Sequence, residues 1–544
     1  MRVSTCCRLL SLSALLLSPL LVQSADSVDS GRRLYRDGMG VDGKPVVATV
    51  QGDVPVNGAQ VACAGCHKRS GLGASEGGSR ALVVTAPVLF GPPSAQPANL
   101  LQGRPPYTDQ TLKAAIAVGH ASDGRELDAL MPRYRLSNAD MSALTAYLRV
   151  LGTEAAPGVG DADLELATIV SADAPARDRE AVAAVVQRFA TFKNGGTRNE
   201  QRRAEASRRH LYGERHARAF RQWHVSVWTL TGAPSGWPAQ LEALYAQRPP
   251  FAVISGAAGD HWSVVDDFCE RKELPCVLPV TALPRAITGG FYNVYFSAGV
   301  RLDARVTASS IDQGFDAAGG NVLLVHMDDA RGQAARDAFG ASWPASRKDN
   351  LVSRAIAVDA ALSPRYWQDL IAHERPGVLV AWVAPAQLQA LVAAAASAPT
   401  LPSRIYTADS FTDWTTTKAP PAFEGRVLHV YPYNLPAPGL TQFPREQAWL
   451  NSQGLGALET RAAAEALFAC HAVGEAMLGM ADNYSRDYLV ETLEHMLDGT
   501  SMTTLFPVTT LGTGQRYLVK GAYVTRLAPQ GEGVRYASIG WIQP

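Results

Sequence analysis

From about Leu164 to the end of the chain, short apolar runs alternate with segments of helical periodicity, and this alternation constrains the fold more than any other feature. The runs are LATIV (166–170), HVSVWTL (224–230), FAVIS (251–255), CVLPV (276–280), NVLLVHM (321–327), GVLVAWV (377–383), RIYTA (404–408) and RVLHVYP (426–432). Strands that alternate with helices form βαβ units, whose parallel sheets are covered on both faces. Residues 164–544 are too many for one domain built on a single sheet. The pattern therefore predicts an α/β module of two lobes.

Residues 25–153 differ from this module, because they are rich in glycine and loops and end in one clear helix. A stretch of small residues, proline and glycine follows at 154–163, without apolar periodicity, and is typical of an interdomain linker. We therefore predict a small domain at 25–153, a linker at 154–163 and the two-lobed module at 164–544.

The N-terminus has the parts of a secretory signal peptide. Arg2 and Arg8 supply positive charge, the apolar run 9–21 is too short to span a bilayer, and small residues precede the cleavage point. We predict that residues 1–24 are removed and that the mature protein lies in the periplasm. Proline and glutamine interrupt a second apolar stretch at 377–398, which predicts a strand, a turn and a helix, so no membrane span is expected.

The charge of the chain argues against two classes of partner. Lys+Arg and Asp+Glu number 50 each, so the formal net charge is +0. No overall field attracts nucleic acid or an anionic membrane, and neither is an expected partner. The arginine-rich segment 198–221 is typical of a solvated helix face, with docking of an acidic redox partner as the alternative.

The most specific motif is Cys63-Ala-Gly-Cys66-His67. C-x-x-C-H attaches c-type haem: both thiols bond covalently to the haem, and the histidine binds the iron. A zinc site needs four ligands, and residues 25–153 contain no third cysteine. A thioredoxin-like dithiol is the alternative, although residues 57–62 before the motif form a poor strand. The motif predicts one covalent haem c.

A second axial ligand is expected from the same domain, where the candidates are Met39, His120, Met131 and Met141. Met141 falls on the apolar stripe of a helix predicted at 137–151, which identifies it as a core residue. Met131 precedes Pro132, which favours an extended backbone at the residue before it and suits a loop that presents a thioether. Met131 is the predicted ligand, with His120 or an open position as alternatives.

The helices predicted at the two ends of this domain carry further signals. Gly31 and Tyr35 lie in the opening helix and Tyr147 in the closing helix. With the haem motif and Met131-Pro132, they make residues 29–151 resemble a class I cytochrome c, whose terminal helices cross at these positions. The resemblance implies a small all-α domain with haem iron bound by His67 and Met131. The glycine-rich stretch 38–61 departs from the family pattern.

The second module carries an ordered set of features: FAVISG (251–256), a helix to Cys269, LPCVLP (274–279), YFS (295–297) and NVLLVHMDDARG (321–332). Their order resembles a type I periplasmic binding protein of the branched-chain amino-acid receptor kind, in which two Rossmann-like lobes close on a small ligand. The expected fold class is therefore multidomain, with a small all-α cytochrome c domain and a two-lobed α/β module.

In open α/β sheets, ligands bind beyond the carboxyl ends of strands, where loops and helix starts present backbone N–H groups. The predicted cleft residues are Ser255, Gly256, Ala257, Thr281 and Asp409, with ordinary strand-end turns as the alternative. Asp260 follows in the loop where the family binds a ligand's carboxylate, and it repels an anionic ligand unless it faces away. An amino-acid ligand is therefore not assumed.

Five of the seven cysteines remain after removal of residues 1–24. Cys269 and Cys276 lie at a predicted helix end and strand start, and a disulfide between them would stabilise the fold by about 2.5 kcal/mol. Two buried thiols are the alternative. Cys470, inside a predicted helix at 461–480, is read as a core residue rather than a nucleophile.

Together these features predict a periplasmic monohaem c-type cytochrome that transfers electrons, with a solute-binding-like module for ligand sensing or partner docking. Met/His ligation fills both axial positions, so an enzyme such as a haem peroxidase is not expected. The expected partners are a periplasmic dehydrogenase or another cytochrome, and a small-molecule ligand. The alternative is a solute-binding receptor of a transporter with an appended cytochrome domain.

Overall fold

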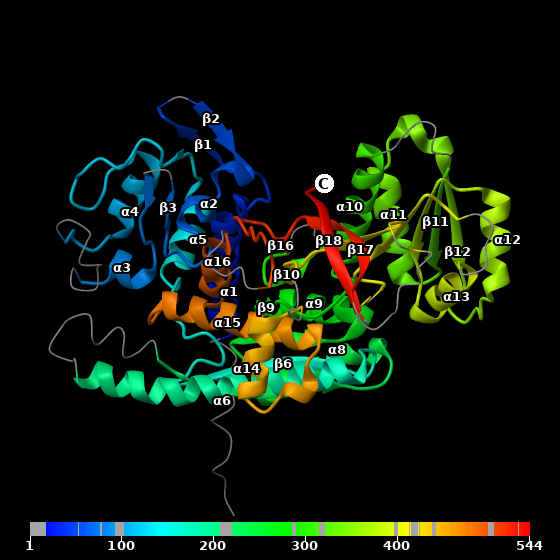
Figure 1. Ribbon diagram of the computed structural model, residues 1–544. Coiled ribbons are helices and arrows are strands. Elements are labelled where there is room, and N and C mark those ends of the chain that lie inside the picture. Colours follow the sequence, from blue (N-terminus) through cyan, green and yellow to red (C-terminus); the bar gives the residue numbers. More distant parts are fainter. Residues whose placement is uncertain are drawn as a thin grey trace, which may run out of the picture. The chain divides into compact units, whose positions relative to one another are not determined.

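The computed structural model describes residues 18–52, 54–76, 79–92, 103–206, 220–285, 290–314, 321–395, 401–412, 414, 423, 425–437, 442–498, 505–530 and 533–544. The chain divides into two compact units, Met1–Ala156 and Pro157–Pro544, whose elements are labelled in Figure 1. The division falls inside the predicted linker. Residues 1–17 of the predicted signal peptide lie outside the described residues.

The first unit has helices around a small core. The helices are α1 (Ser18–Asp37), α2 (Cys63–His67), α3 (Ala86–Phe90), α4 (Asp109–Ala117) and α5 (Asn138–Leu148). The strands are β1 (Val47–Val50), β2 (Val54–Asn57), β3 (Ala74–Glu76), β4 (Ser79–Ala81) and β5 (Arg133–Tyr134). The Ser137 side chain caps α5 by accepting a hydrogen bond from the Asp140 backbone N–H. The Asp140 carboxylate in turn accepts a hydrogen bond from the Ser137 backbone N–H, and the two bonds fix the start of the helix.

The crossing of α1 and α5 depends on glycine. A Cβ atom at Gly31 would overlap the Ala143 carbonyl and lie 2.8 Å from Cβ of Tyr147, so only glycine allows this approach. One turn further along α1, the Tyr35 ring packs on the Tyr147 ring with centroids 5.3 Å apart. Gly31, Tyr35 and Tyr147, on which the resemblance to cytochrome c partly rests, therefore meet at this crossing.

The glycine-rich stretch 38–61, which departs from the family pattern, forms an added hairpin. β1 pairs with β2 and also, antiparallel, with β5, so that Ala48 lies opposite Tyr134. Ala48 is fully buried. The Gln51 N–H also donates to the Ala129 carbonyl at 3.1 Å. The insertion is thus bonded to the chain on both sides of residue 131.

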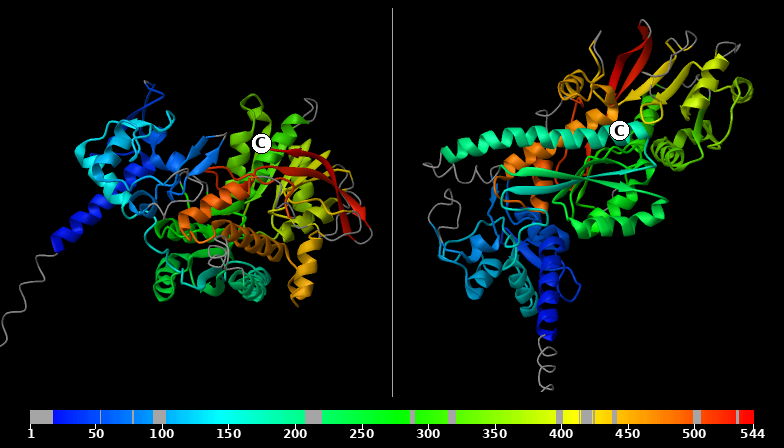
Figure 2. Two further views of the ribbon diagram at one scale, coloured as in Figure 1. Left: turned by 90° about the vertical axis from the view of Figure 1, so that its left-hand side faces the viewer. Right: turned by 90° about the horizontal axis from the view of Figure 1, so that it is seen from below.

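The first lobe of the second unit is a parallel sheet in the order β16-β10-β9-β8-β6-β7. Its strands are β6 (Asp163–Ser171), β7 (Gln222–Leu230), β8 (Ala252–Ala257), β9 (Cys276–Val277), β10 (Asn293–Ser297) and β16 (Tyr517–Val519). Its helices are α6 (Ala176–Ala206), α8 (Trp237–Gln247), α9 (Trp262–Arg271), α14 (Pro444–Ser452), α15 (Arg461–Met480) and α16 (Arg486–Met496). The long helix α6 is clear in Figure 2 and packs on α15 and β7.

The second lobe is a sheet in the order β12-β11-β13-β14-β15-β17-β18. Its strands are β11 (Val322–Met327), β12 (Leu351–Ile356), β13 (Val378–Trp382), β14 (Arg404–Ala408), β15 (Val427–Tyr431), β17 (Ala522–Gln530) and β18 (Gly533–Ile542). Its helices are α10 (Val300–Gln313), α11 (Ala330–Ser342), α12 (Pro364–Glu374) and α13 (Pro385–Ala395). The pairs α10–α11 and α12–α13 pack together beside the sheet (Figure 1).

The predicted alternation is confirmed, because each apolar run named from the sequence contains or overlaps a strand. The hairpin β17–β18 was not predicted, and it pairs antiparallel with β15 at the edge of the otherwise parallel sheet. The stretch 377–398 forms β13 and α13 as expected, its last residues lying outside the described part. None of the helices in the described ranges has the length and apolar character that a bilayer crossing requires.

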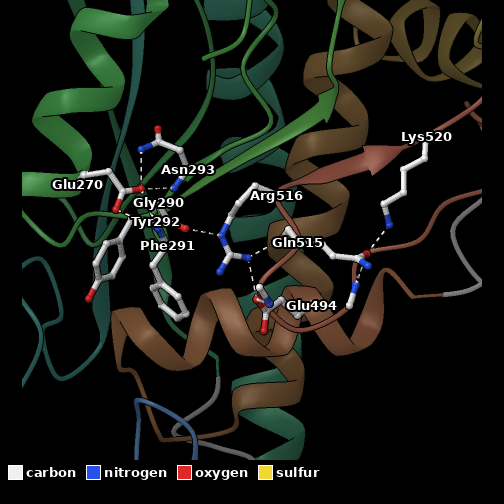
Figure 3. Close-up of polar contacts among 11 residues, drawn as sticks. Glu270, Gly290, Phe291, Tyr292, Asn293, Glu494, Gln515, Arg516 and Lys520 are labelled. Carbon is white, nitrogen blue, oxygen red and sulfur yellow. Dashed lines mark hydrogen bonds and ion pairs between the residues drawn. The ribbon is translucent and has the colours of Figure 1, made fainter. Parts of the chain in front are cut away.

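A buried polar network ties the start of β10 to β16 and α16 (Figure 3). The Glu270 carboxylate accepts hydrogen bonds of 2.8 to 3.1 Å from the backbone N–H groups of residues 291–293. The Arg516 guanidinium donates to the Gly290 carbonyl at 3.2 Å and pairs with Glu494 at 2.7 Å. Both charged side chains are buried, so the pair holds the edge strand in place away from water.

A disulfide links the end of α9 to β9. Cys269 and Cys276 are bonded, with their Cα atoms 6.3 Å apart. Both residues are fully buried in the core of the first lobe. Cys470 is also buried, within α15, and burial raises the pKa of its thiol. It packs as a core residue.

Candidate functional site

The haem motif forms the short helix α2, which exposes Cys66 and leaves Cys63 half-buried. Both thiols are free, and Cys63 packs against the hydrophobic core of the unit. Its Sγ lies 3.9 Å from the Tyr134 hydroxyl, which donates to the Val61 carbonyl at 2.6 Å. One helical turn thus brings both thiols and His67 together.

The His67 ring has a fixed orientation. Its Nδ1 lies 2.8 Å from the Leu82 carbonyl oxygen, so Nδ1 carries the proton and donates. This bond leaves Nε2 as the nitrogen available to a metal. Burial lowers the pKa of His67, which favours the neutral ring that binds metal.

The predicted second ligand, Met131, is half-buried and lies just before β5. The Arg133 guanidinium holds this segment by donating to the carbonyls of Met131, at 2.6 Å, and Leu127, at 2.9 Å. A Cβ atom at Gly119, where φ is +82°, would overlap that guanidinium, so glycine makes room for it. The hairpin of β1 and β2 bonds to the same segment through Ala129 and β5.

The other candidates for the second ligand occupy different surroundings. Met141 lies in α5 and packs against the core cluster, as the helical stripe predicts. His120 is exposed and forms an isolated bridge with Glu126. Met39 forms a bridge with Pro45 at the base of the insertion.

The donors of this unit fit a covalently bound haem. Two free thiols on one helix can attach it, and the oriented ring of His67 offers Nε2 to the iron. The half-buried Met131 offers a thioether from a loop that hydrogen bonds hold in place.

The second unit contains a cavity of about 70 Å³ between its lobes. It is lined by the segments that follow β9, β10, β14 and β15, and by Asp303, Arg461 and Glu465. α10 with Asp303 packs in the second lobe, and α15 with Arg461 and Glu465 packs in the first. The volume is sufficient for several waters or a small ligand.

Two of the predicted cleft residues, Thr281 and Asp409, line this cavity. Ser255, Gly256 and Ala257 do not, since they are buried within β8. The Trp262 ring covers this strand end at Gly256, because a Cβ atom there would lie 2.5 Å from the ring.

The acidic groups of the cavity have different partners. Asp409 pairs with Arg461, and its Oδ1 lies 3.9 Å from Nε2 of the buried His429. Although burial opposes it, these two neighbours lower the pKa of Asp409. Asp303 accepts a hydrogen bond from the Ser410 N–H at 3.2 Å, and Glu465 accepts one from the Tyr433 hydroxyl at 2.7 Å.

Burial dominates the other two carboxyl groups. It raises the pKa of Asp303 to about 7 and that of Glu465 to about 7. Neither residue was singled out from the sequence. A usable signal existed for Glu465, since it and Arg461 are spaced i, i+4 at the start of an otherwise apolar helix.

Asp260, in the loop after β8, was expected to repel an anionic ligand unless it faced away, and it is paired with Arg331. The Nε–H of Arg331 donates one bifurcated hydrogen bond to the two carboxylate oxygens of Asp260, which lie 2.5 and 2.7 Å from Nε. Arg331 belongs to α11 of the second lobe, so the ion pair neutralises Asp260 and joins the lobes.

Each of the two units is similar to known proteins. The family model for cytochrome c matches residues 56–152. No curated protein matches the chain.

Solved structures match the second unit at low sequence identity. The matches include a fatty acid ABC transporter substrate-binding protein from Thermomonospora curvata, with TM-score 0.53, 13% identity and coverage of 72% of this chain and 95% of that chain. A branched-chain amino acid ABC transporter protein from Thermus thermophilus with bound valine gives TM-score 0.52, 13% identity and coverage of 70% and 97%. A substrate-binding protein from Sphaerobacter thermophilus gives TM-score 0.51, 14% identity and coverage of 70% and 98%. The chain therefore contains a region that matches the cytochrome c family and a second unit with the type I periplasmic binding protein fold.

Proposed function

We propose that the protein is a periplasmic electron carrier with one haem c, attached through Cys63 and Cys66 and bound at the iron by His67 and Met131. The observation that carries this proposal is the α2 helix, where two free thiols accompany a histidine whose Nδ1 is committed to Leu82. The match of residues 56–152 to cytochrome c supports it.

A haem held in this way supplies a one-electron couple. The residues of the chain orient and shield it. The bond from His67 to Leu82 fixes the ring that would offer Nε2 to the iron, and Arg133 fixes the backbone that carries Met131. Two protein ligands leave no iron position for a substrate, which suits electron transfer better than catalysis.

We propose domain limits of 25–153 and 164–544, with a linker at 154–163 and a signal peptide at 1–24. Export to the periplasm suits both a c-type cytochrome and a binding-protein fold. The redox partner in this proposal is a dehydrogenase or another cytochrome of the same compartment.

The second unit is proposed to bind a small molecule in the cavity between its lobes, as a sensor or a docking device for the cytochrome. Its position beyond the carboxyl ends of the strands is where open α/β sheets bind ligands. A second candidate function is a receptor that delivers a solute to a transporter, and the similar substrate-binding proteins of ABC transporters favour it.

The attachment is tested by replacing both Cys63 and Cys66 with alanine in the full-length chain. Haem-stained denaturing electrophoresis is expected to lose the stained band, because both covalent bonds are gone. Cys470→Ala is the matched control and should keep the stain. Circular dichroism should retain the α/β signal of the second unit, and covalent haem in the double variant would refute the attachment.

A further inference from the structure

The cavity between the lobes is rich in carboxyl groups. Among its described lining residues, Asp303, Asp409 and Glu465 face a single guanidinium, that of Arg461. Arg461 and Asp409 pair with each other, which leaves Asp303 and Glu465 without a counter-charge in hydrogen-bond contact. The two residues approach from different lobes, on α10 and α15.

Several groups that could bind an anionic ligand are already engaged. The Thr281 hydroxyl donates to the Gly259 carbonyl at 3.1 Å, and the Ser410 N–H donates to Asp303. The Tyr433 hydroxyl donates to Glu465, and Arg461 is bound to Asp409. A carboxylate in this cavity would therefore meet acceptors where it needs donors.

Glu465 retains an unused acceptor. The residue is only 7% exposed, and its Oε1 accepts the Tyr433 hydroxyl. In the described part of the chain its second carboxyl oxygen has no hydrogen-bond partner. This oxygen is not buried, so a ligand that enters the cavity can reach it and donate a hydrogen bond to it.

We propose that this cavity binds a small primary amine as its ammonium ion, held by Asp303 from the second lobe and Glu465 from the first. The inference rests on the proposed ligand-binding role of the second unit and names its ligand class. An ammonium group has three N–H donors, so it can bond to more than one of the acceptor oxygens that line the cavity. The rings of Phe296 and Tyr433 in the lining suit the apolar part of such a ligand.

The protonation of the cavity agrees with a cationic ligand. Burial raises the pKa of Asp303 and of Glu465 to about 7, so the unliganded carboxyls hold protons near neutral pH. The other charged or titratable groups that act on them are Asp178, Asp409, Tyr433 and Arg461. An ammonium ion favours the ionised carboxylates, so binding releases protons and strengthens as pH rises through 7.

The test is isothermal calorimetry on the full-length chain with n-butylamine, butyrate and valine. The pH is set about one unit above the pKa of both carboxyls, so that they are ionised. Butylamine is expected to bind at least about tenfold more tightly than butyrate, which has the same chain length and opposite charge. Tighter binding of butyrate or valine, or no binding of butylamine, would overturn the proposal.

Two variants locate the binding site. Asp303→Asn and Glu465→Gln should each weaken butylamine binding about tenfold or more, since each replaces a charged carboxylate with a neutral amide of similar shape. Asp312→Asn is the control, because Asp312 lies on α10 but pairs with Arg347 and does not line the cavity. Circular dichroism of each variant verifies the fold, and unchanged affinity in both cavity variants would refute the assignment.

A redox titration of the same samples separates this inference from the proposed electron transfer. A reversible haem couple with no amine binding overturns the ligand class alone. Amine binding without a haem couple supports the ligand class and overturns the electron carrier.

Discussion

Met131 sits in a segment that is held from two directions. Arg133 bonds to its carbonyl from within the segment, and the inserted hairpin bonds to Ala129 and β5 from outside. His67 is held through Leu82 in a comparable way. Ligand side chains whose backbone is fixed lose little entropy on binding a metal, so these contacts favour stable axial ligation.

Replacing Met131 with alanine should open one axial position. We expect a lower reduction potential and binding of carbon monoxide to the ferrous protein, because methionine ligation raises the potential and blocks the iron. Met141→Leu is the matched control and should change packing alone, since Met141 lies against the core. Potentiometry and ferrous–CO spectra measure both effects, and the reverse pattern would exclude Met131 as the ligand.

The raised pKa of Asp303 predicts a pH-dependent stability. A carboxyl with a pKa of about 7 when folded and 3.8 as its ordinary value binds more protons in the folded chain. The free energy of unfolding therefore falls as pH rises from about 4 to 7, by at most about 1.4 kcal/mol per pH unit for this group. Asp303→Asn should flatten that slope in urea unfolding followed by tryptophan fluorescence, and identical slopes would contradict the account.

The candidate haem residues could be named from the sequence because they are close together in the chain. The cavity residues could be named only in part, because the fold brings them together from distant segments. Cys63 and His67 lie within one helical turn, so their spacing alone specifies their chemistry. Asp303 and Glu465 line the same cavity because the chain passes between the lobes more than once, and no local pattern in the sequence encodes that arrangement. The rule for strand ends selected Thr281 and Asp409, which line the cavity, but also Gly256, which the Trp262 ring covers.

At the scale of elements, the α1–α5 crossing makes a sharp prediction. Gly31→Ala should destabilise the first unit by about 1–3 kcal/mol, because the new methyl group overlaps the Ala143 carbonyl. Gly340→Ala is the control, since that position in α11 has open space and helix interiors favour alanine. Denaturant unfolding followed by haem absorbance gives the first value, and equal stability of wild type and Gly31→Ala would contradict the crossing.

The Arg516–Glu494 pair should be important for the edge of the first lobe. Arg516→Met leaves Glu494 buried without its counter-charge, which costs about 3–5 kcal/mol. The exposed pair of Arg365 and Asp369 provides the comparison, since Arg365→Met should cost less than about 1 kcal/mol. Urea unfolding of the second unit measures both, and a small effect at Arg516 would show that water reaches the pair.

Sequence periodicity predicted the central strands better than the edges. Runs such as NVLLVHM are buried on both faces, so their apolar composition marks them clearly. The edge strand β12 has exposed residues and the hairpin β17–β18 contains proline and glycine, so neither shows a continuous apolar run. The insertion hairpin was read as a glycine-rich stretch because its strands are short and largely exposed.

At the scale of the whole molecule, one chain carries a cytochrome c domain and a module with the binding-protein fold. If ligand binding favours one haem state, linkage requires that the haem state alter ligand affinity by the same factor. A coupling of about 1–3 kcal/mol gives a ~5- to 150-fold difference in affinity between ferric and ferrous protein. Calorimetry with n-butylamine in both states measures it, and equal affinities would make the module an independent receptor or tether.

The central claim is that the chain holds one covalent haem whose iron has two protein ligands. An optical redox titration of the full-length protein, followed by addition of carbon monoxide to the ferrous form, tests it most directly. The account predicts a single one-electron wave and a ferrous spectrum that carbon monoxide leaves unchanged. A chain without covalent haem, or a wild-type ferrous protein that binds carbon monoxide, would contradict it.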